Sequence, residues 1–151
     1  MRFRLASLGV LAIVVGLVAA PIPKAKPPKD EDAIQGVWQV EKFDSDGAPV
    51  PSPAEAAQMK VTFKEGKMTM THGGMAVIEG TFKLDPTAKV KEIDLTQNNR
   101  VTLGIYELDG DTLKLCLAEM QGAARPTEMK PEGKQVVVAT LKRVKDAKKD
   151  K

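Results

Sequence analysis

The 151-residue chain contains only one cysteine, one histidine, one tryptophan and one tyrosine. The single cysteine, Cys116, excludes an intrachain disulfide, so the fold must rest on its apolar core. The single histidine, His72, would have to lie beside Cys116 to form a Cys–His dyad. No Ser-His-Asp set, phosphate-binding glycine loop or paired-carboxylate site is recognisable. We therefore predict that the protein is not an enzyme.

The central part of the chain also lacks an excess of charge of either sign. The net charge of the whole chain is +3. Residues 34–143, however, hold 14 Lys and Arg against 15 Asp and Glu, so the basic excess lies in the tails. Binding to nucleic acid without sequence preference needs a basic face that neutralises several phosphates. The composition therefore predicts no nucleic-acid partner.

The N-terminal segment has the pattern of a signal peptide. Arg2 and Arg4 precede the uncharged apolar run Leu5–Ala20, which ends in small residues. This run is short for a membrane span, which needs roughly 20 residues. We expect residues 1–20 to direct export, to the periplasm, the cell envelope or the medium. Because Pro21 is unfavourable for cleavage after Ala20, an uncleaved N-terminal anchor is the alternative, and only then would the mature form span a membrane.

Two further segments are too polar to bury a core. Residues 21–33 combine four prolines with lysines and acidic residues, which predicts an extended linker. Residues 144–151 are rich in Lys and Asp and predict a charged, disordered tail. The folded domain is therefore predicted to span residues 34–143.

Within this domain, apolar and polar residues alternate with the period of two that is typical of β-strands. Turn signals such as Glu65-Gly66, Gly73-Gly74 and Asp109-Gly110-Asp111 separate the alternating runs. The predicted strands are 34–43, 59–64, 67–72, 75–84, 90–96, 101–108, 112–118 and 136–143.

Short turns connect nearly all of these eight strands, and no helix is long enough for a parallel crossover. The one predicted helix is a short one in the first long loop, 44–58, capped by Ser52. A closed up-and-down barrel suits consecutive hairpins better than a sandwich does, and it leaves no exposed sheet edge. We therefore predict an all-β, eight-stranded antiparallel barrel.

Several motifs resemble known families. The runs Gly80–Pro86, Ile93–Thr96, Gly104–Ala118 and Arg125–Glu128 are similar to an uncharacterised domain family that is abundant in planctomycete bacteria. Gly36-x-Trp38 near the start, with Arg143 near the end, resembles the lipocalins, and Tyr106–Asp109 stands where lipocalins have Thr-Asp-Tyr. The resemblance implies a lipocalin-like barrel and no particular activity.

Alternating strand directions sort the candidate residues of this barrel onto two ends. They place Gly36, Trp38 and Arg143 together as a structural barrel base, where the arginine can stack on the indole. They gather the loops 44–58, 72–74, 97–100 and 119–134 at the opposite, open end. Ligands of small barrels bind at such a mouth. The candidate binding residues there are His72, Asn98, Asn99, Arg100, Arg125 and Glu128, and the alternative is that they are ordinary solvated loop residues.

A soft donor set lies on one predicted strand. Met68, Met70 and His72 alternate onto one face, and Met75 follows across the hairpin. Thioether and imidazole groups suit copper, especially Cu(I). Since methionines also pack well in irregular cores, we favour a packing role for the methionines and a turn position for His72, and we predict no cofactor. Cys116 is predicted to be a buried, inert thiol.

The sequence thus predicts an exported, non-enzymatic binding module of lipocalin-like architecture. Its expected partner is a small apolar ligand at the open barrel end. The alternative is a protein-interaction or inhibitor barrel with a filled core, using the loops 44–58 and 119–134. A copper-binding or enzymatic role is a weaker alternative.

Overall fold

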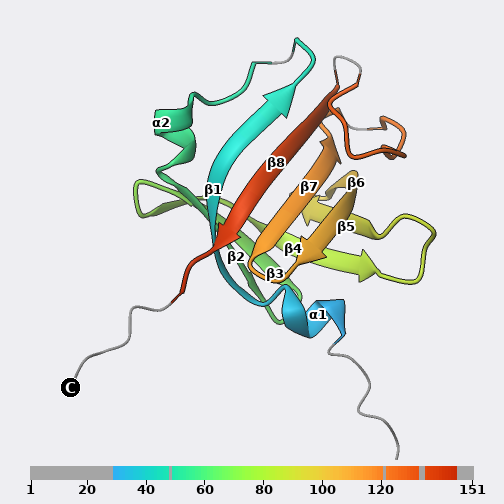
Figure 1. Cartoon of the computed structure of the whole chain (residues 1–151), viewed down its shortest axis with the longest axis horizontal. Helices are drawn as coiled ribbons and strands as arrows, with labels where there is room; N and C mark the ends of the chain where they lie inside the picture. Colours follow the sequence, from blue (N-terminus) through green and yellow to red (C-terminus); the bar gives the residue numbers. More distant parts are fainter. Residues whose placement is uncertain (1–28, 48, 121, 133–134, 146–151) are drawn as a thin grey trace, which may run out of the picture.

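A computed structural model describes residues 29–47, 49–120, 122–132 and 135–145. These residues form eight strands and two helices of about one turn each (Figure 1). The predicted signal peptide, residues 1–20, lies outside the described residues, as do residues 21–28 of the predicted linker and 146–151 of the predicted tail.

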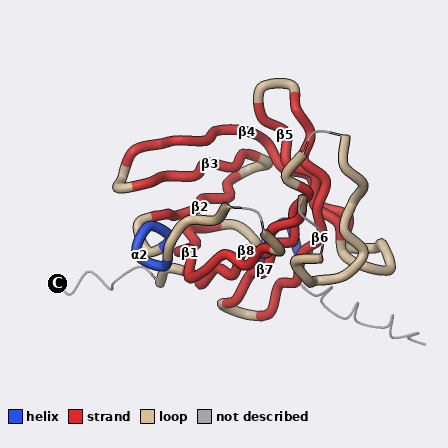
Figure 2. The backbone as a smooth tube through the Cα atoms, turned by 90° about the horizontal axis from the view of Figure 1, so that it is seen from above, coloured by secondary structure: helices blue, strands red, loops and turns tan. Residues whose placement is uncertain are grey.

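The strands follow one another around a closed antiparallel barrel. Each strand pairs with the next, and the last pairs with the first (Figure 2). This confirms the predicted all-β class and the eight-stranded up-and-down barrel. The strands are β1 (Gly36–Ser45), β2 (Met59–Lys64), β3 (Lys67–His72), β4 (Met75–Asp85), β5 (Glu92–Gln97), β6 (Arg100–Asp109), β7 (Thr112–Ala118) and β8 (Val136–Arg143).

The core occupies the interior of the barrel. Alternate residues face inward, and the largest fully buried side chains there are Trp38, Tyr106 and Phe63. The ring of Phe63 meets that of Phe82 edge to face, with the ring centres 5.0 Å apart. Side chains therefore fill the half of the barrel that contains Trp38.

The short helix α2 (Pro53–Ala56) begins where the sequence predicted it. The Ser52 hydroxyl accepts a hydrogen bond from the Glu55 backbone, and the Glu55 carboxylate accepts one from the Ser52 backbone at 2.8 Å. The Gln39 side chain on β1 donates to the carbonyl oxygens of Ala56 and Ala57, and so holds the helix against the barrel. The predicted helix and its Ser52 cap are therefore confirmed.

The linker prediction needs a correction at its end. Residues Asp30–Ala33 form a second helix, α1, which lies beneath the barrel end that contains Trp38 (Figure 1). Acidic residues in its first turn favour helix formation, because the helix dipole is positive there. The completely buried side chain of Ile34 then anchors the helix to the core. The polar composition of the segment concealed this anchor.

The start of the predicted tail also belongs to the barrel. The Val144 backbone N–H donates to the Val37 carbonyl at 2.8 Å, and the Lys145 ammonium pairs with Asp111 at 2.9 Å. In the part of the chain that the structure describes, no helix has the length and apolar character needed to cross a membrane.

Candidate functional site

One end of the barrel is sealed by the predicted contact between the first and last strands. The Arg143 guanidinium lies over the Trp38 ring, 4.2 Å from its centre. It also donates to the carbonyl oxygens of Gln35, at 2.7 Å, and Ala33. The buried Trp38 indole N–H donates to the Ile34 carbonyl at 2.8 Å. The indole is thus held by the Ile34 carbonyl and by Arg143, so the protein's own groups close this part of the barrel interior.

Gly36, the third residue of the predicted base, makes space for the arginine. Its backbone has a φ of 121°, a conformation that side chains disfavour. A Cβ atom at this position would lie 3.0 Å from a guanidinium nitrogen of Arg143. The glycine therefore serves both the backbone turn and the stacking of Arg143.

A buried hydroxyl fixes α1 across the same end. The Tyr106 hydroxyl donates to the Asp30 carboxylate at 2.7 Å, and Lys91 pairs with the same oxygen at 2.7 Å. Burial alone would raise the pKa of Asp30, but the hydrogen bonds from Lys91 and Tyr106 outweigh it and lower the pKa. Burial, followed by the hydrogen bond to Asp30, raises the pKa of Tyr106, so the phenol stays a donor. This end of the barrel is therefore structural.

Four of the predicted binding residues do lie at the open end, on two tight turns. Asn98 and Asn99 have positive φ values of 48° and 61°, a conformation that Asn tolerates well, so they serve the β5–β6 turn. Arg100 pairs in register with Gln97, and a hollow of about 370 Å³ lies beside these residues. Its lining residues are polar, unlike the apolar cavity expected for a small apolar ligand. His72 ends β3 and is exposed.

The inside of the open end is apolar and only partly buried. Six side chains that pack against the buried core lie toward this end, and each keeps part of its surface exposed: Phe43, Met59, Met70, Ile78, Leu95 and Leu117. The hollows that the described residues form most clearly lie elsewhere, at the β5–β6 turn, on the outer wall and beside α1. The inside of the mouth is therefore lined by apolar side chains that keep part of their surface exposed.

The rim of the open end carries exposed apolar side chains, of which the sequence analysis singled out only Met75. Among the described residues, six large hydrophobic side chains are exposed, and only Val90 lies toward the sealed end. The five at the open end are Val50, Met75, Val77, Val101 and Met120. Met75 has the largest exposed fraction, 73%. The signal in the sequence was an apolar residue directly beside a turn, as at Gly74-Met75.

The other two predicted binding residues are not at the mouth, and this prediction is wrong. Residues 122–132 of the 119–134 loop fold back over the outside of the barrel. Its Met129, with Val136, packs against the outward-facing side chains of Ile105, Cys116 and Val138. These strand residues are apolar on the outer face too, so covering them removes apolar surface from water. Arg125 and Glu128 therefore lie on the outer wall.

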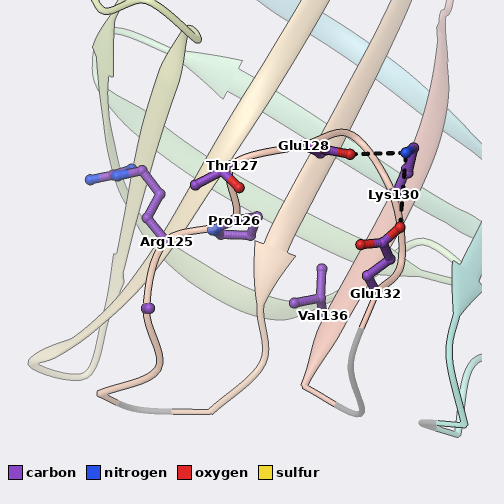
Figure 3. Close-up of a pocket in the computed structure, with 8 residues that line it drawn as sticks. Arg125, Pro126, Thr127, Glu128, Lys130, Glu132 and Val136 are labelled. Carbon is purple, nitrogen blue, oxygen red and sulfur yellow. Dashed lines mark ion pairs between the residues drawn. The ribbon is translucent and has the colours of Figure 1, made fainter.

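Arg125 is the main attachment of this loop to the wall. Its guanidinium donates to the Gly104 carbonyl at 2.7 Å and to the Ile93 carbonyl at 3.3 Å. It also pairs with Asp94 at 2.7 Å and with Glu92 at 3.1 Å. Figure 3 shows its side chain pointing away from the Glu128, Lys130 and Glu132 group of the same loop. All of these partners belong to the protein itself, so Arg125 acts as a clasp.

The loop also covers Cys116, which is buried as predicted. Its thiol donates to the Glu128 carbonyl at 3.5 Å. Burial raises the pKa of Cys116, against a smaller lowering effect of the Lys130 backbone. Cys116 faces outward under the loop, whereas His72 lies on β3 with the inward-facing residues of the open end. The two residues therefore form no catalytic dyad.

Comparison of the chain with protein-family models, with curated proteins and with solved structures found no match. The resemblances to the planctomycete domain family and to the lipocalins therefore stay predictions. Within the described residues, no group of three His, Cys, Asp or Glu side chains could hold a metal ion. The open barrel end is where the described residues carry most of their exposed large hydrophobic side chains.

Proposed function

We propose that the protein is an exported, non-enzymatic binding module that holds an apolar surface of a partner protein against its open barrel end. The observation that carries this proposal is the distribution of exposed hydrophobic side chains. Five of the six exposed large hydrophobic side chains in the described residues lie at this one end. Two lie in the long loops that follow β1 and β7, and three lie at the starts of β4 and β6. Exposed apolar side chains that gather on one face are typical of protein interaction sites, and these five share one end of the barrel.

The core favours a protein over a small molecule as the partner. The side chains of Trp38, Tyr106 and Phe63 are at most 1% exposed and fill the half of the barrel at the sealed end. An eight-stranded barrel has an interior that side chains alone can fill. The exposed rim residues come from four separate segments around the mouth, so a broad surface suits them better than a compact ligand. This is the alternative that the sequence analysis kept open, a filled barrel that binds through its loops.

A small apolar ligand is the second candidate, because the inside of the mouth is also apolar. Met70, Ile78 and Leu95 face inward near the open end and remain partly exposed. A compact apolar molecule seated on these side chains would remove that surface from water, which is favourable by about 25 cal/mol per Å².

Native mass spectrometry of the protein isolated from its own host separates the two candidates. The rim variant Met75→Lys/Val77→Lys places two charges on the proposed surface. The control variant Val90→Lys places one on the exposed hydrophobic residue of the sealed end. We expect a bound protein with the wild type and the control, and none with the rim variant. A bound small molecule favours the second candidate, and a partner protein that binds equally to all three proteins contradicts the proposed surface.

A further inference from the structure

The open barrel end brings the only histidine of the chain into a row with two methionines. Met59 on β2 is the register partner of His72 on β3, and His72 is the register partner of Met75 on β4. Residues directly opposite in antiparallel strands share a face, with their Cβ atoms about 4.5–5.5 Å apart. The imidazole therefore stands between two thioether side chains on the same face of the sheet.

A third methionine lies in the neighbouring row. Met70 precedes His72 by two residues and so shares its face. Its register partners are Val61 and Ile78, which places it next to the first row and nearer to the core. Met68, two residues further on, is only 5% exposed and pairs with Phe63, so it is a packing residue. The donor set is thus Met59, Met70, His72 and Met75.

Local backbone features hold this arrangement. Gly73 and Gly74 both have positive φ and form the tight turn that sets His72 opposite Met75. The Gly73 N–H donates to the Gln58 carbonyl at 3.0 Å, which extends the β2–β3 ladder beyond Met59. A bulge in β4 at Val77 lets both Met75 and Ile78 stay in register with the same face of β3.

The donor chemistry selects the ion. Thioether ligands are soft and favour Cu(I), imidazole also binds copper, and Mg²⁺ and Ca²⁺ prefer the carboxylate oxygens that these four side chains lack. Met59 and Met70 are partly buried, whereas His72 and Met75 are exposed, so an ion could enter directly from solvent. We propose that Met59, Met70, His72 and Met75 form a Cu(I) site at the open barrel end. This inference goes beyond the proposed function, which requires no metal.

Anaerobic titration of the purified protein with Cu(I) against a chromogenic chelator tests the proposal. We expect the wild type to withdraw one equivalent of Cu(I) from the chelator. His72→Gln and Met75→Leu should each weaken the binding by about tenfold or more, at least the loss typical of disturbing a metal site. Both positions are exposed, so the fold should survive, which circular dichroism checks. Met120→Leu changes an exposed methionine outside the set and should bind as the wild type does.

A wild type that withdraws no Cu(I), or a His72→Gln variant that binds as tightly as the wild type, would overturn the proposal. So would tighter binding of Zn²⁺ than of Cu(I). A second measurement uses Ag(I), which resembles Cu(I) in softness. The methyl NMR signals of Met59, Met70 and Met75 should shift on Ag(I) addition, while that of Met120 stays. Met75→Leu keeps an apolar rim and should still bind the partner protein, so failure of the metal site and failure of the proposed function can be told apart.

Discussion

Arg143 and Trp38 join the two ends of the barrel sheet at one point. They are register partners on β8 and β1, and the guanidinium lies 4.2 Å from the centre of the indole ring. The same guanidinium donates to the Gln35 carbonyl, 108 residues away in the chain. The residue that ends the last strand thus fixes the segment that leads into the first.

Arg143→Ala should lower the free energy of unfolding by about 2–4 kcal/mol, because it removes a cation–π contact and charge-assisted hydrogen bonds to two partly buried carbonyls. Arg143→Lys should recover only part of the loss, because an ammonium lacks the planar fork of the guanidinium. Urea denaturation followed by Trp38 fluorescence measures the effect. Lys142→Ala is the control, since this exposed neighbour has one side-chain bond, to Thr112. Equal losses at both positions would contradict the assigned role.

The contact between Asp30 and Tyr106 predicts sensitivity to acid. The pKa of Asp30 is lowered in the folded protein from its ordinary value of 3.8. Its contribution to stability is therefore fully present above that value and is lost as the pH falls through the lower, folded pKa. Between about pH 5 and pH 2, the wild type should lose more stability than Asp30→Asn does. Tyr106→Phe should behave in between, because Lys91 still pairs with the carboxylate.

Urea denaturation at a series of pH values tests this prediction. Asp46→Asn is a suitable control, because Asp46 is exposed in the loop after β1, far from α1. Its pH dependence should match that of the wild type. If Asp30→Asn shows the same pH dependence as the wild type, α1 is not held by this carboxylate.

The strands could be predicted closely because turn residues delimit them. β2, β3, β7 and β8 begin and end at the predicted residues, and Gly-rich or Asp-rich turns bound the hairpins. Alternation then fixed which residues share a face, and from that the contact of Trp38 with Arg143. These inferences succeed because they depend only on local periodicity and strand direction.

The path of a long loop does not follow from such local rules. The position of the 119–134 loop depends on the outer faces of β6–β8, which the alternation argument did not consider. The run Leu115-Cys116-Leu117 is apolar on both faces, which is typical of a strand covered on both sides. Val136–Ala139 shows the same pattern. Read in this way, the sequence would have predicted a covered outer wall and moved Arg125 away from the mouth.

The Arg125 clasp should control access to Cys116. Arg125→Ala removes the bonds to Gly104, Asp94 and Glu92, so the loop should open more often. Arg125→Ala should lower the free energy of loop opening by about 1.4 kcal/mol or more. Thiol labelling of Cys116 should then become at least about tenfold faster. Labelling with a chromogenic disulfide reagent at pH 7.5 measures the rate.

Lys130→Ala is the matched control for that experiment. Lys130 lies in the same loop, but its ion pairs reach only Glu128 and Glu132, which are exposed neighbours in that loop. Surface pairs of this kind contribute little, so the labelling rate should stay near that of the wild type. If Lys130→Ala accelerates labelling as much as Arg125→Ala does, the loop is not held by the clasp.

Gly104 should be intolerant of any side chain, although it lies in the middle of a strand. A Cβ atom there would lie 2.5 Å from a methyl carbon of Leu117 and 2.8 Å from the Cys116 carbonyl oxygen. Leu117 can rotate away, but the carbonyl belongs to the neighbouring strand and can move only if β7 moves. Gly104→Ala should therefore cost about 1–3 kcal/mol of stability. Leu117→Ala removes the methyl carbon that the new Cβ atom would meet. The double variant should therefore cost less stability than the sum of the two single changes. Thermal and urea denaturation of the four proteins test this, with Thr102→Ala on the same strand as the control, and strictly additive losses would mean that Leu117 is not the limiting neighbour.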